Sequence, residues 1–373
     1  MLRKKRLHVM LVLGARPQII KSAQLIHLAK KNSEIEFDLV HTGQHYDYEM
    51  SKVFFDELKL PDAIANLEVG SGTHAWQTAQ IMIRLEKITK FKKPDLIIVP
   101  GDTNSTLAGA LVATKQNIPI AHMEAGARSY DMSMPEEVNR RLTDHCSSLL
   151  FTPTANCTKN LLKEGIDKDR IFQTGDTMYD MVLQQLPKVH KNIIIRELGL
   201  VSKTYALITI HRPENVDDSR NLRSITNSMM QLENITFVFP VHPRTKKQLR
   251  KINVYSKLLE KSHIKVIEPL GYHEILKLIQ NAKVVLTDSG GIQKEAFWLH
   301  TACITLRENT EWIETVHLKV NQLAGADTKK IMEAVNRVDE KGETLRKEPK
   351  KLPNLFGEGQ ASQKVLDAIL QYQ

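Results

Sequence analysis

The chain has 373 residues, which exceeds the size at which one hydrophobic core usually stops growing, so we expect two domains. Its formal net charge is +9, but acids interrupt the Lys and Arg residues, and the basic runs 3–6 and 341–351 lack the interleaved aromatic side chains that stack on bases. This charge suits a substrate that carries a diphosphate and argues against a nucleic-acid partner. No apolar segment is long enough to span a bilayer, so we expect no membrane partner.

Three cysteines occur, Cys146, Cys157 and Cys303, and no two of them form a C-x-x-C pair. This spacing argues against a disulfide framework or a structural zinc site and fits a reducing cytoplasm. The segment 3–13 superficially resembles a signal peptide, but its apolar part is short and has no small-residue cleavage site. We expect it to contain the first strand.

Short apolar runs that favour β-structure alternate with helical patterns along the chain. In the first half they are 8–13, 37–41, 95–100 and 149–152, and after a stretch around 178–200 they resume at 205–210, 235–240, 264–267 and 284–287. Such runs predict parallel sheets buried on both faces, so the expected fold class is α/β with two doubly wound parallel sheets. Near the end, a helical apolar stripe follows a possible N-cap, Ser362, and predicts a final helix. The stripe consists of Val365, Leu366, Ile369 and Leu370.

Polar loops follow the predicted strands. They are 14–17, 101–105, 122–128, 211–214, 242–244 and 288–291. In open α/β sheets the ligand binds beyond the carboxyl ends of the strands. We therefore expect these loops to point towards one ligand-binding cleft.

The loop 14–17 is a candidate phosphate site. It offers the guanidinium of Arg16 and, one helical turn later, the ammonium of Lys21 at the start of a helix. The alternative is that Pro17 simply occupies the first helical position beside ordinary surface cations.

The turn formed by Ser289, Gly290 and Gly291 is a second candidate phosphate site, because its backbone N–H groups can approach a diphosphate. Glu295, one turn into the next helix, is placed to accept ribose hydroxyls; a plain tight turn is the alternative. The first strand is not followed by G-x-G-x-x-G, which disfavours NAD, and we expect no cofactor.

Three acids lie in or beside the polar loops, where proton transfer needs positioned carboxylates. They are Asp102, Glu124 and Glu136. Each has a structural alternative: Asp102 can cap the following helix, Glu124 can pair with Arg128, and Glu136 can interact with a helix dipole, as can its neighbour Glu137.

His211 ends a predicted strand and is placed to donate a hydrogen bond or a proton to a departing phosphate oxygen, although a lone histidine there is often structural. His242, near Arg244, has the same two interpretations. None of the 14 histidines lies in an H-E-x-x-H or comparable pattern, so we expect no metal.

The loops resemble, in order and wording, those of the non-hydrolysing UDP-N-acetylglucosamine 2-epimerases over nearly the whole chain. The matching stretches are GARPQIIK at 14–21, HTGQH at 41–45, GDTNST at 101–106, EAGAR at 124–128, PEEVNR at 135–140, IHRPEN at 210–215, VHPR at 241–244 and DSGGIQ at 288–293. The resemblance implies two Rossmann-like domains in the B-type glycosyltransferase arrangement with an interdomain active site. The first would be 1–178 with the terminal helix in 356–373 packed back on it, and the second, 179–355, would bind UDP.

The resemblance also implies a homodimer that works in cell-surface polysaccharide biosynthesis. The implied reaction interconverts UDP-N-acetylglucosamine and UDP-N-acetylmannosamine without NAD, by elimination of UDP to a 2-acetamidoglucal and re-addition. The catalytic residues implied are Asp102, Glu124, Glu136 and His211. The substrate-binding residues implied are Arg16, Lys21, Arg140, Arg212, His242, Ser289, Gly290, Gly291 and Glu295.

Two features depart from the common bacterial pattern. Gln18 replaces a Glu, and the segment 45–48 differs from that of activator-regulated members, where Asp47 argues against activation by substrate. With the segment 53–58, they resemble a branch that acts on UDP-2,3-diacetamido-2,3-dideoxyglucuronic acid, so that substrate is an alternative. Further alternatives are a hydrolysing epimerase, a glycosyltransferase on the same fold, and a non-catalytic nucleotide-sugar binding protein.

Overall fold

The computed structural model describes residues 6–44, 55–347 and 352–372. The chain divides into two compact units: unit 1 comprises Met1–Leu183 and Asn354–Gln373, and unit 2 comprises Gln184–Pro353. Helix α7 (Thr177–Lys191) carries the chain from unit 1 into unit 2, and the boundary expected after residue 178 lies at its start.

Unit 1 is built on a parallel sheet in the order β3-β2-β1-β4-β5-β6-β7. The strands are β1 (Leu7–Leu13), β2 (Ile35–His41), β3 (Ala65–Asn66), β4 (Leu96–Pro100), β5 (Ile120–Met123), β6 (Leu149–Thr152) and β7 (Ile171–Gln173). Strands β4, β5 and β6 are buried along their whole length, in keeping with their largely apolar sequences. The direction of winding reverses between β1 and β4, which pair in register from Val9 with Leu96.

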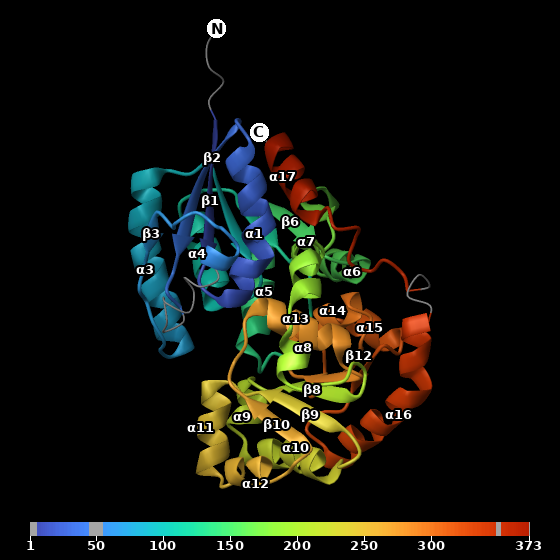
Figure 1. Cartoon of the computed structure of the whole chain (residues 1–373). Coiled ribbons are helices and arrows are strands. Elements are labelled where there is room, and N and C mark those ends of the chain that lie inside the picture. The colour runs from blue at the N-terminus through green and yellow to red at the C-terminus, as the bar shows by residue number, and fades with distance from the viewer. Residues whose placement is uncertain (1–5, 45–54, 348–351, 373) are drawn as a thin grey trace. The chain divides into compact units, whose positions relative to one another are not determined.

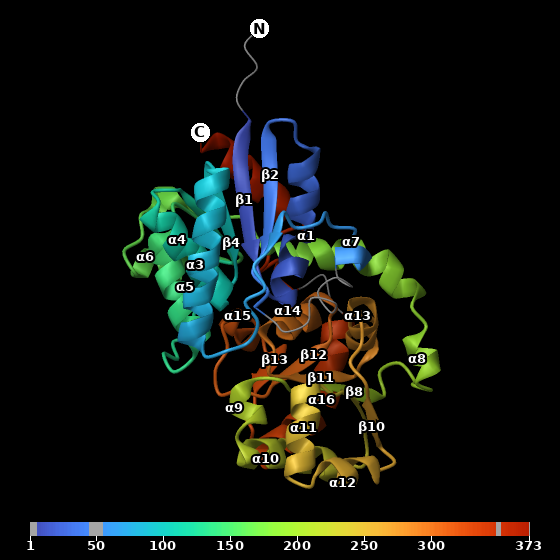
Figure 2. The same ribbon diagram turned by 90° about the vertical axis from the view of Figure 1, so that its left-hand side faces the viewer.

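Helices cover both faces of this sheet (Figures 1 and 2). One face carries α1 (Arg16–Lys31) and α17 (Ala361–Gln371), which pack side by side; the other carries α3 (His74–Lys92), α4 (Asn104–Lys115), α5 (Pro135–Cys146) and α6 (Ala155–Lys163). The stripe on α17 is buried at Val365, Leu366 and Ile369, which confirms the final helix. Its predicted N-cap is wrong: the N-cap is Gln360, and Ser362 lies inside the helix.

Unit 2 repeats the pattern with a parallel sheet in the order β10-β9-β8-β11-β12-β13. Its strands are β8 (Tyr205–Thr209), β9 (Thr236–Pro240), β10 (Ile264–Ile267), β11 (Val284–Thr287), β12 (Ala302–Thr305) and β13 (Asn321–Leu323). Its helices are α8 (Ile194–Glu197), α9 (Pro213–Val216), α10 (Ser219–Gln231), α11 (Pro243–Lys251), α12 (Tyr255–Leu259), α13 (Tyr272–Asn281), α14 (Gly290–Trp298), α15 (Ile313–His317) and α16 (Thr328–Lys347). Here the winding reverses between β8 and β11.

The expected α/β class with two doubly wound parallel sheets is confirmed. Counted by its own strands, the sheet of unit 2 has the order 3-2-1-4-5-6, and the sheet of unit 1 has the same order with a seventh strand added at the end. In such sheets ligands bind at the reversal point, beyond the carboxyl ends of the strands on either side of it. In the described parts of the chain, no helix is both long and apolar enough to cross a membrane.

Candidate functional site

In unit 1 the reversal point lies between the loops that follow β1 and β4. Gly14 occupies the tightest place there: a Cβ atom on it would lie 1.9 Å from Oγ1 of Thr42 and 2.4 Å from Oγ of Ser105. Those two hydroxyls are hydrogen-bonded to each other at 2.7 Å. Only glycine therefore lets the loops after β1, β2 and β4 approach this closely.

Gln18, in the first turn of α1, links these loops by hydrogen bonds and is buried, with 1% of its surface exposed. Its Oε1 accepts hydrogen bonds from the backbone N–H groups of Gly14 (2.8 Å) and Ala15 (3.0 Å). Its Nε2 donates to the carbonyl of Pro100 (2.8 Å) and to Oγ1 of Thr106 (3.0 Å). Both donors and both acceptor positions of the amide are thus used, and the amide, rather than a carboxylate, fits this position.

Asp102 follows β4 and is held by Arg140 of α5, whose Nη2 lies 2.6 Å from Oδ2. Arg140 is in turn fixed by Glu137, a fully buried acid 2.8 Å from its Nη1. Burial raises the pKa of Glu137, but hydrogen bonds from Ser129 and the charge of Arg140 outweigh burial and lower that pKa below its usual value. The N-cap of α4 is Thr103, so Asp102 is not the cap of that helix.

Glu124, directly after β5, accepts from Nζ of Lys21 at 2.6 Å, and both side chains are only 12% exposed. Lys21 lies on α1, so the ion pair joins the loops of β1 and β5 across the reversal point. Glu124 also has a backbone φ of 68°, a conformation that non-glycine residues seldom adopt. Arg128, its expected alternative partner, is 2.7 Å from each of two other acids, Asp144 and Glu164.

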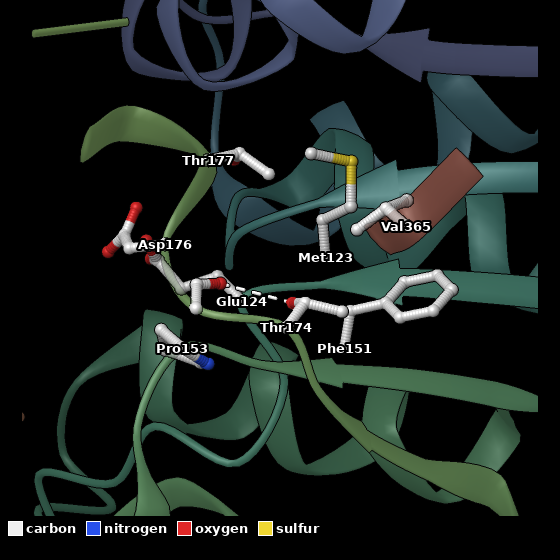
Figure 3. Close-up of a pocket in the computed structure, with 9 residues that line it drawn as sticks. Met123, Glu124, Phe151, Pro153, Thr174, Asp176, Thr177 and Val365 are labelled. Atoms are coloured by element: carbon white, nitrogen blue, oxygen red, sulfur yellow. Dashed lines mark hydrogen bonds between the residues drawn. The ribbon is translucent and has the colours of Figure 1, made fainter. Parts of the chain in front are cut away.

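A small pocket of about 10 Å³ lies beside Glu124 (Figure 3). Its wall includes Asp176 and Thr177 from the turn into α7, and Val365 from α17. At this volume it has room for about one water molecule and none for a sugar. The pocket is therefore a small gap beside the Glu124 loop and not a substrate site.

In unit 2 the reversal point brings the loops after β8 and β11 together around Asp288, which is completely buried. Its carboxylate lies 3.0 Å from Nδ1 of His211 and accepts from the backbone N–H of His211 and of Arg212, the latter at 3.0 Å. Nδ2 of Asn215 donates to it as well, at 3.1 Å. Burial raises the pKa of Asp288, but these partners, His211 first, outweigh burial and lower it. Asp288 therefore fixes the His211 ring through Nδ1, while 44% of the histidine side chain stays exposed.

The turn after β11 has the form expected of an anion-binding turn. Ser289 is the N-cap of α14 and accepts from the N–H of Ile292 at 3.4 Å, and Gly290 and Gly291 form the first turn. A Cβ on Gly290 would lie 3.3 Å from Nε1 of Trp312, so the backbone there is closely packed on its inner side. Glu295 is buried one turn further along α14.

The remaining predicted residues lie at helix starts. Arg16 is the first residue of α1, and Glu136 is the second residue of α5. Arg212 is the N-cap of α9, and His242 is the N-cap of α11, where its Nδ1 accepts from the N–H of Arg244 at 3.3 Å. The segment 45–48, including Asp47, lies outside the described residues.

The two reversal points thus gather the predicted residues into two groups, one on each unit. Unit 1 pairs Lys21 with Glu124 and Asp102 with Arg140; unit 2 places His211 beside the 289–291 turn. Sequence reasoning gave no positioning role to three buried acids, Glu137, Asp144 and Asp288. A detectable signal for the first two was the run of polar residues on the inner face of α5.

Comparison with known proteins agrees with this arrangement. The sequence profile of a family described as "UDP-N-acetylglucosamine 2-epimerase" matches residues 27–370. A Methanococcus maripaludis protein named "UDP-N-acetylglucosamine 2-epimerase homolog" is 46% identical over 97% of this chain and 99% of its own. A Pseudomonas aeruginosa UDP-2,3-diacetamido-2,3-dideoxy-D-glucuronate 2-epimerase is 38% identical over 97% of this chain and 99% of its own.

The crystal structure of Methanocaldococcus jannaschii UDP-GlcNAc 2-epimerase in complex with UDP-GlcNAc and UDP superposes with a TM-score of 0.89. That protein is 44% identical, and the match covers 98% of this chain and 100% of that one. The resemblance noted from the loops is confirmed by the profile and by both relatives. On this evidence the chain belongs to the UDP-N-acetylglucosamine 2-epimerase family.

Proposed function

We propose that this protein is an isomerase that reversibly converts UDP-N-acetylglucosamine into UDP-N-acetylmannosamine. The observation that carries the proposal is the pairing of two carboxylates with two cations at the reversal point of unit 1, Glu124 with Lys21 and Asp102 with Arg140, each at 2.6 Å. Proton transfer at carbon requires such positioned carboxylates, and an anionic leaving group requires such cations. A protein that only binds an anionic nucleotide sugar would gain nothing from the acids.

The chemistry follows from the poor acidity of the hydrogen at C2 while the sugar is intact. The C1–O bond breaks and its electron pair leaves with UDP, so that positive charge develops at the ring and the C2 proton can pass to a carboxylate. The product of this step is a 2-acetamidoglucal. UDP then adds back to C1 while C2 accepts a proton on the opposite face, which gives the epimer.

We assign the acid and base roles to Asp102, Glu124 and Glu136, and stabilisation of the leaving diphosphate to Arg16, Lys21 and His211. Each well-placed donor of this kind is worth roughly 3 to 4 kcal/mol in the transition state. His211 suits the task because Asp288 fixes its Nδ1 and leaves the ring partly exposed.

We assign binding of the UDP moiety to the Ser289–Gly291 turn, to Glu295, and to Arg212 and His242, with Arg140 supporting Asp102. The N-terminus of α14 favours an anion because its first backbone N–H groups point outwards and the helix dipole is positive there. In this assignment the nucleotide-binding residues belong to unit 2, and the proton-handling acids belong to unit 1.

A homodimer in the cytoplasm is part of the same proposal. Helix α3 exposes three large apolar side chains, Trp76 (45%), Ile83 (53%) and Phe91 (82%), which is unusual for a surface that faces only water. None of the three described cysteines forms a disulfide, which fits a reducing location. Light scattering should give the mass of two chains for the native protein, and that of one chain for Ile83→Glu combined with Phe91→Glu; a native monomer would contradict the dimer.

The first experiment is proton NMR of the purified protein with UDP-N-acetylglucosamine in deuterated water, without added NAD. We expect UDP-N-acetylmannosamine with deuterium at C2. Release of free N-acetylmannosamine would instead identify a hydrolysing enzyme. If this substrate is unchanged, the same measurement with UDP-2,3-diacetamido-2,3-dideoxyglucuronic acid tests the alternative, and inertness of both would refute the epimerase assignment.

A further inference from the structure

A group of buried charges lies beneath the two acid loops of unit 1. His122 of β5, Asp144 of α5 and Arg128 all have side chains with no exposed surface. Asp144 is the centre of the group: its Oδ1 lies 2.7 Å from Nδ1 of His122, and its Oδ2 lies 2.7 Å from Nη1 of Arg128. None of these three side chains has been given a part in the reaction above.

The first arm of this group reaches the Asp102 loop. Nε2 of His122 lies 2.7 Å from the carbonyl oxygen of Gly101, the residue before Asp102. The ring therefore lies between a carboxylate and a peptide carbonyl, with one of these oxygen atoms at each ring nitrogen. The orientation of the peptide that leads into Asp102 thus depends on Asp144 through one imidazole ring.

The second arm reaches the Glu124 loop. Oδ2 of Asp144 accepts from the backbone N–H of Gly126 at 3.2 Å, two residues after Glu124. Gly126 has a φ of 78°, and a Cβ there would lie 2.3 Å from the carbonyl oxygen of Cys157. The left-handed backbone of Glu124, at φ 68°, persists because its neighbours are held on both sides.

Arg128, the third member of this group, also contacts Glu164. Its Nε and Nη2 donate to the two carboxylate oxygens of Glu164 at 2.8 and 2.7 Å. The fork geometry fixes the guanidinium in one orientation, and so fixes the end of the loop that starts at Glu124. Ordinary apolar side chains would fill the same space without the desolvation that buried charges entail, so the charges are better explained by the geometry they impose.

We propose that Asp144 is a positioning residue that sets both proton-handling acids at once, Asp102 through His122 and Glu124 through the N–H of Gly126. It acts through these groups and touches no substrate atom. The inference rests on the proposed epimerase function, and its test separates the two.

The test compares Asp144→Asn with Asp180→Asn, because Asp180 is a buried carboxylate of the same unit whose hydrogen bonds, within the described part of the chain, go to the backbone N–H groups of Ala361 and Ser362 and not to an acid loop. Each variant is assayed with substrate carrying hydrogen or deuterium at C2. For Asp144→Asn we expect kcat to fall about 100-fold with little change in KM, since a misplacement of about 1 Å has effects of that size. We also expect the deuterium isotope effect on kcat to rise, because C–H cleavage becomes slower relative to the other steps.

The control variant should lower thermal stability and leave the isotope effect as in the native enzyme, since loss of folded protein slows all steps equally. If Asp144→Asn behaves like Asp180→Asn, with an unchanged isotope effect, Asp144 is merely structural and the inference is wrong. If Asp144→Asn does not fold, His122→Gln carries the same test, because it removes the imidazole that links Asp144 to the Gly101 carbonyl and leaves the contact between Asp144 and Gly126 in place. A native enzyme that turns over neither UDP-sugar would refute the proposed function instead, before any variant is compared.

Discussion

At the scale of single residues, the two acids of unit 1 are each neutralised by a cation in the resting protein. Lys21 lies 2.6 Å from Glu124 and Arg140 lies 2.6 Å from Asp102, and each cation fixes the direction of its carboxylate. The cations come from two different helices, Lys21 from α1 and Arg140 from α5, so each acid has an ion-pair partner of its own.

The carboxylate variants test these assignments. Asp102→Asn, Glu124→Gln and Glu136→Gln should each keep the fold and the affinity for UDP while losing at least about 100-fold in turnover, the low end of a general acid–base contribution. Turnover would be followed by NMR and UDP affinity by calorimetry. Full activity in any one variant would remove that acid from the mechanism.

Gln18 allows a test of stability at one position. In Gln18→Glu the carboxylate would face the carbonyl of Pro100, which accepts a hydrogen bond from the amide in the native protein, so we expect a loss of roughly 1 to 3 kcal/mol at neutral pH. A protonated carboxyl can donate there, so part of the loss should be recovered at pH 5. Urea unfolding at both pH values measures this, with Gln184→Glu as the exposed control. An equal loss of unfolding free energy at both pH values would contradict the explanation that the carboxylate lacks a proton to donate to Pro100.

The sequence allowed the loop residues to be chosen but not their partners. Asp102 and Glu124 follow apolar runs, so their position at the ligand edge was predictable. Lys21 and Glu124 lie 103 positions apart in the sequence, and His211 and Asp288 lie 77 positions apart. Only the folded sheet brings the two members of each pair together.

At the scale of elements, the apolar runs predicted β1, β2, β4, β6, β8, β9, β10 and β11, whereas β3, β5, β7, β12 and β13 were missed. The runs at 149–152, 264–267 and 284–287 coincide with β6, β10 and β11. The edge strands β3, β7 and β13, of only two or three residues, carry too few side chains to show a periodicity.

Helix α17 depends on a cap from another helix. Asp180 of α7 accepts from the N–H groups of Ala361 (3.1 Å) and Ser362 (2.6 Å), the first two of α17. Asp180→Ala should therefore cost about 1 to 2 kcal/mol, the usual value of an N-cap, and increase amide hydrogen exchange in α17.

The matched control is Asp218→Ala, which removes the N-cap of α10 in unit 2. It should raise exchange in α10 and leave α17 protected. Equal protection of α17 in the native protein and in Asp180→Ala would show that apolar packing alone holds this helix.

At the scale of the whole molecule, three buried carboxylates decide the response to acid. The pKa values of Glu137, Asp144 and Asp288 are all lowered, because burial, which raises them, is outweighed by their cationic and N–H partners. A carboxyl with a lower pKa in the folded state binds more protons when unfolded, so its stabilisation is complete above the unfolded pKa and is lost as pH falls. Asp180, whose pKa burial raises, acts in the opposite direction.

Thermal unfolding should therefore be nearly independent of pH near neutrality and shift to lower temperature below about pH 4, the usual range of these carboxyls. Calorimetry from pH 3 to pH 8 measures this directly. Asp144→Asn should give a shallower decline on the acid side. If the midpoint temperature of unfolding instead rises as the pH is lowered from 5 to 3, groups with raised pKa values dominate the response to acid.

The return of α17 to unit 1 has a consequence for how the protein is made. The ribosome must finish all of Gln184–Pro353 before the segment that covers α1 emerges, a delay on the order of ten seconds or more. During that interval one face of the sheet of unit 1 lacks α17, whereas unit 2 can fold by itself. Nascent chains released before Asn354 should therefore bind chaperones through the unfinished first unit, even though they already contain every residue assigned here to catalysis.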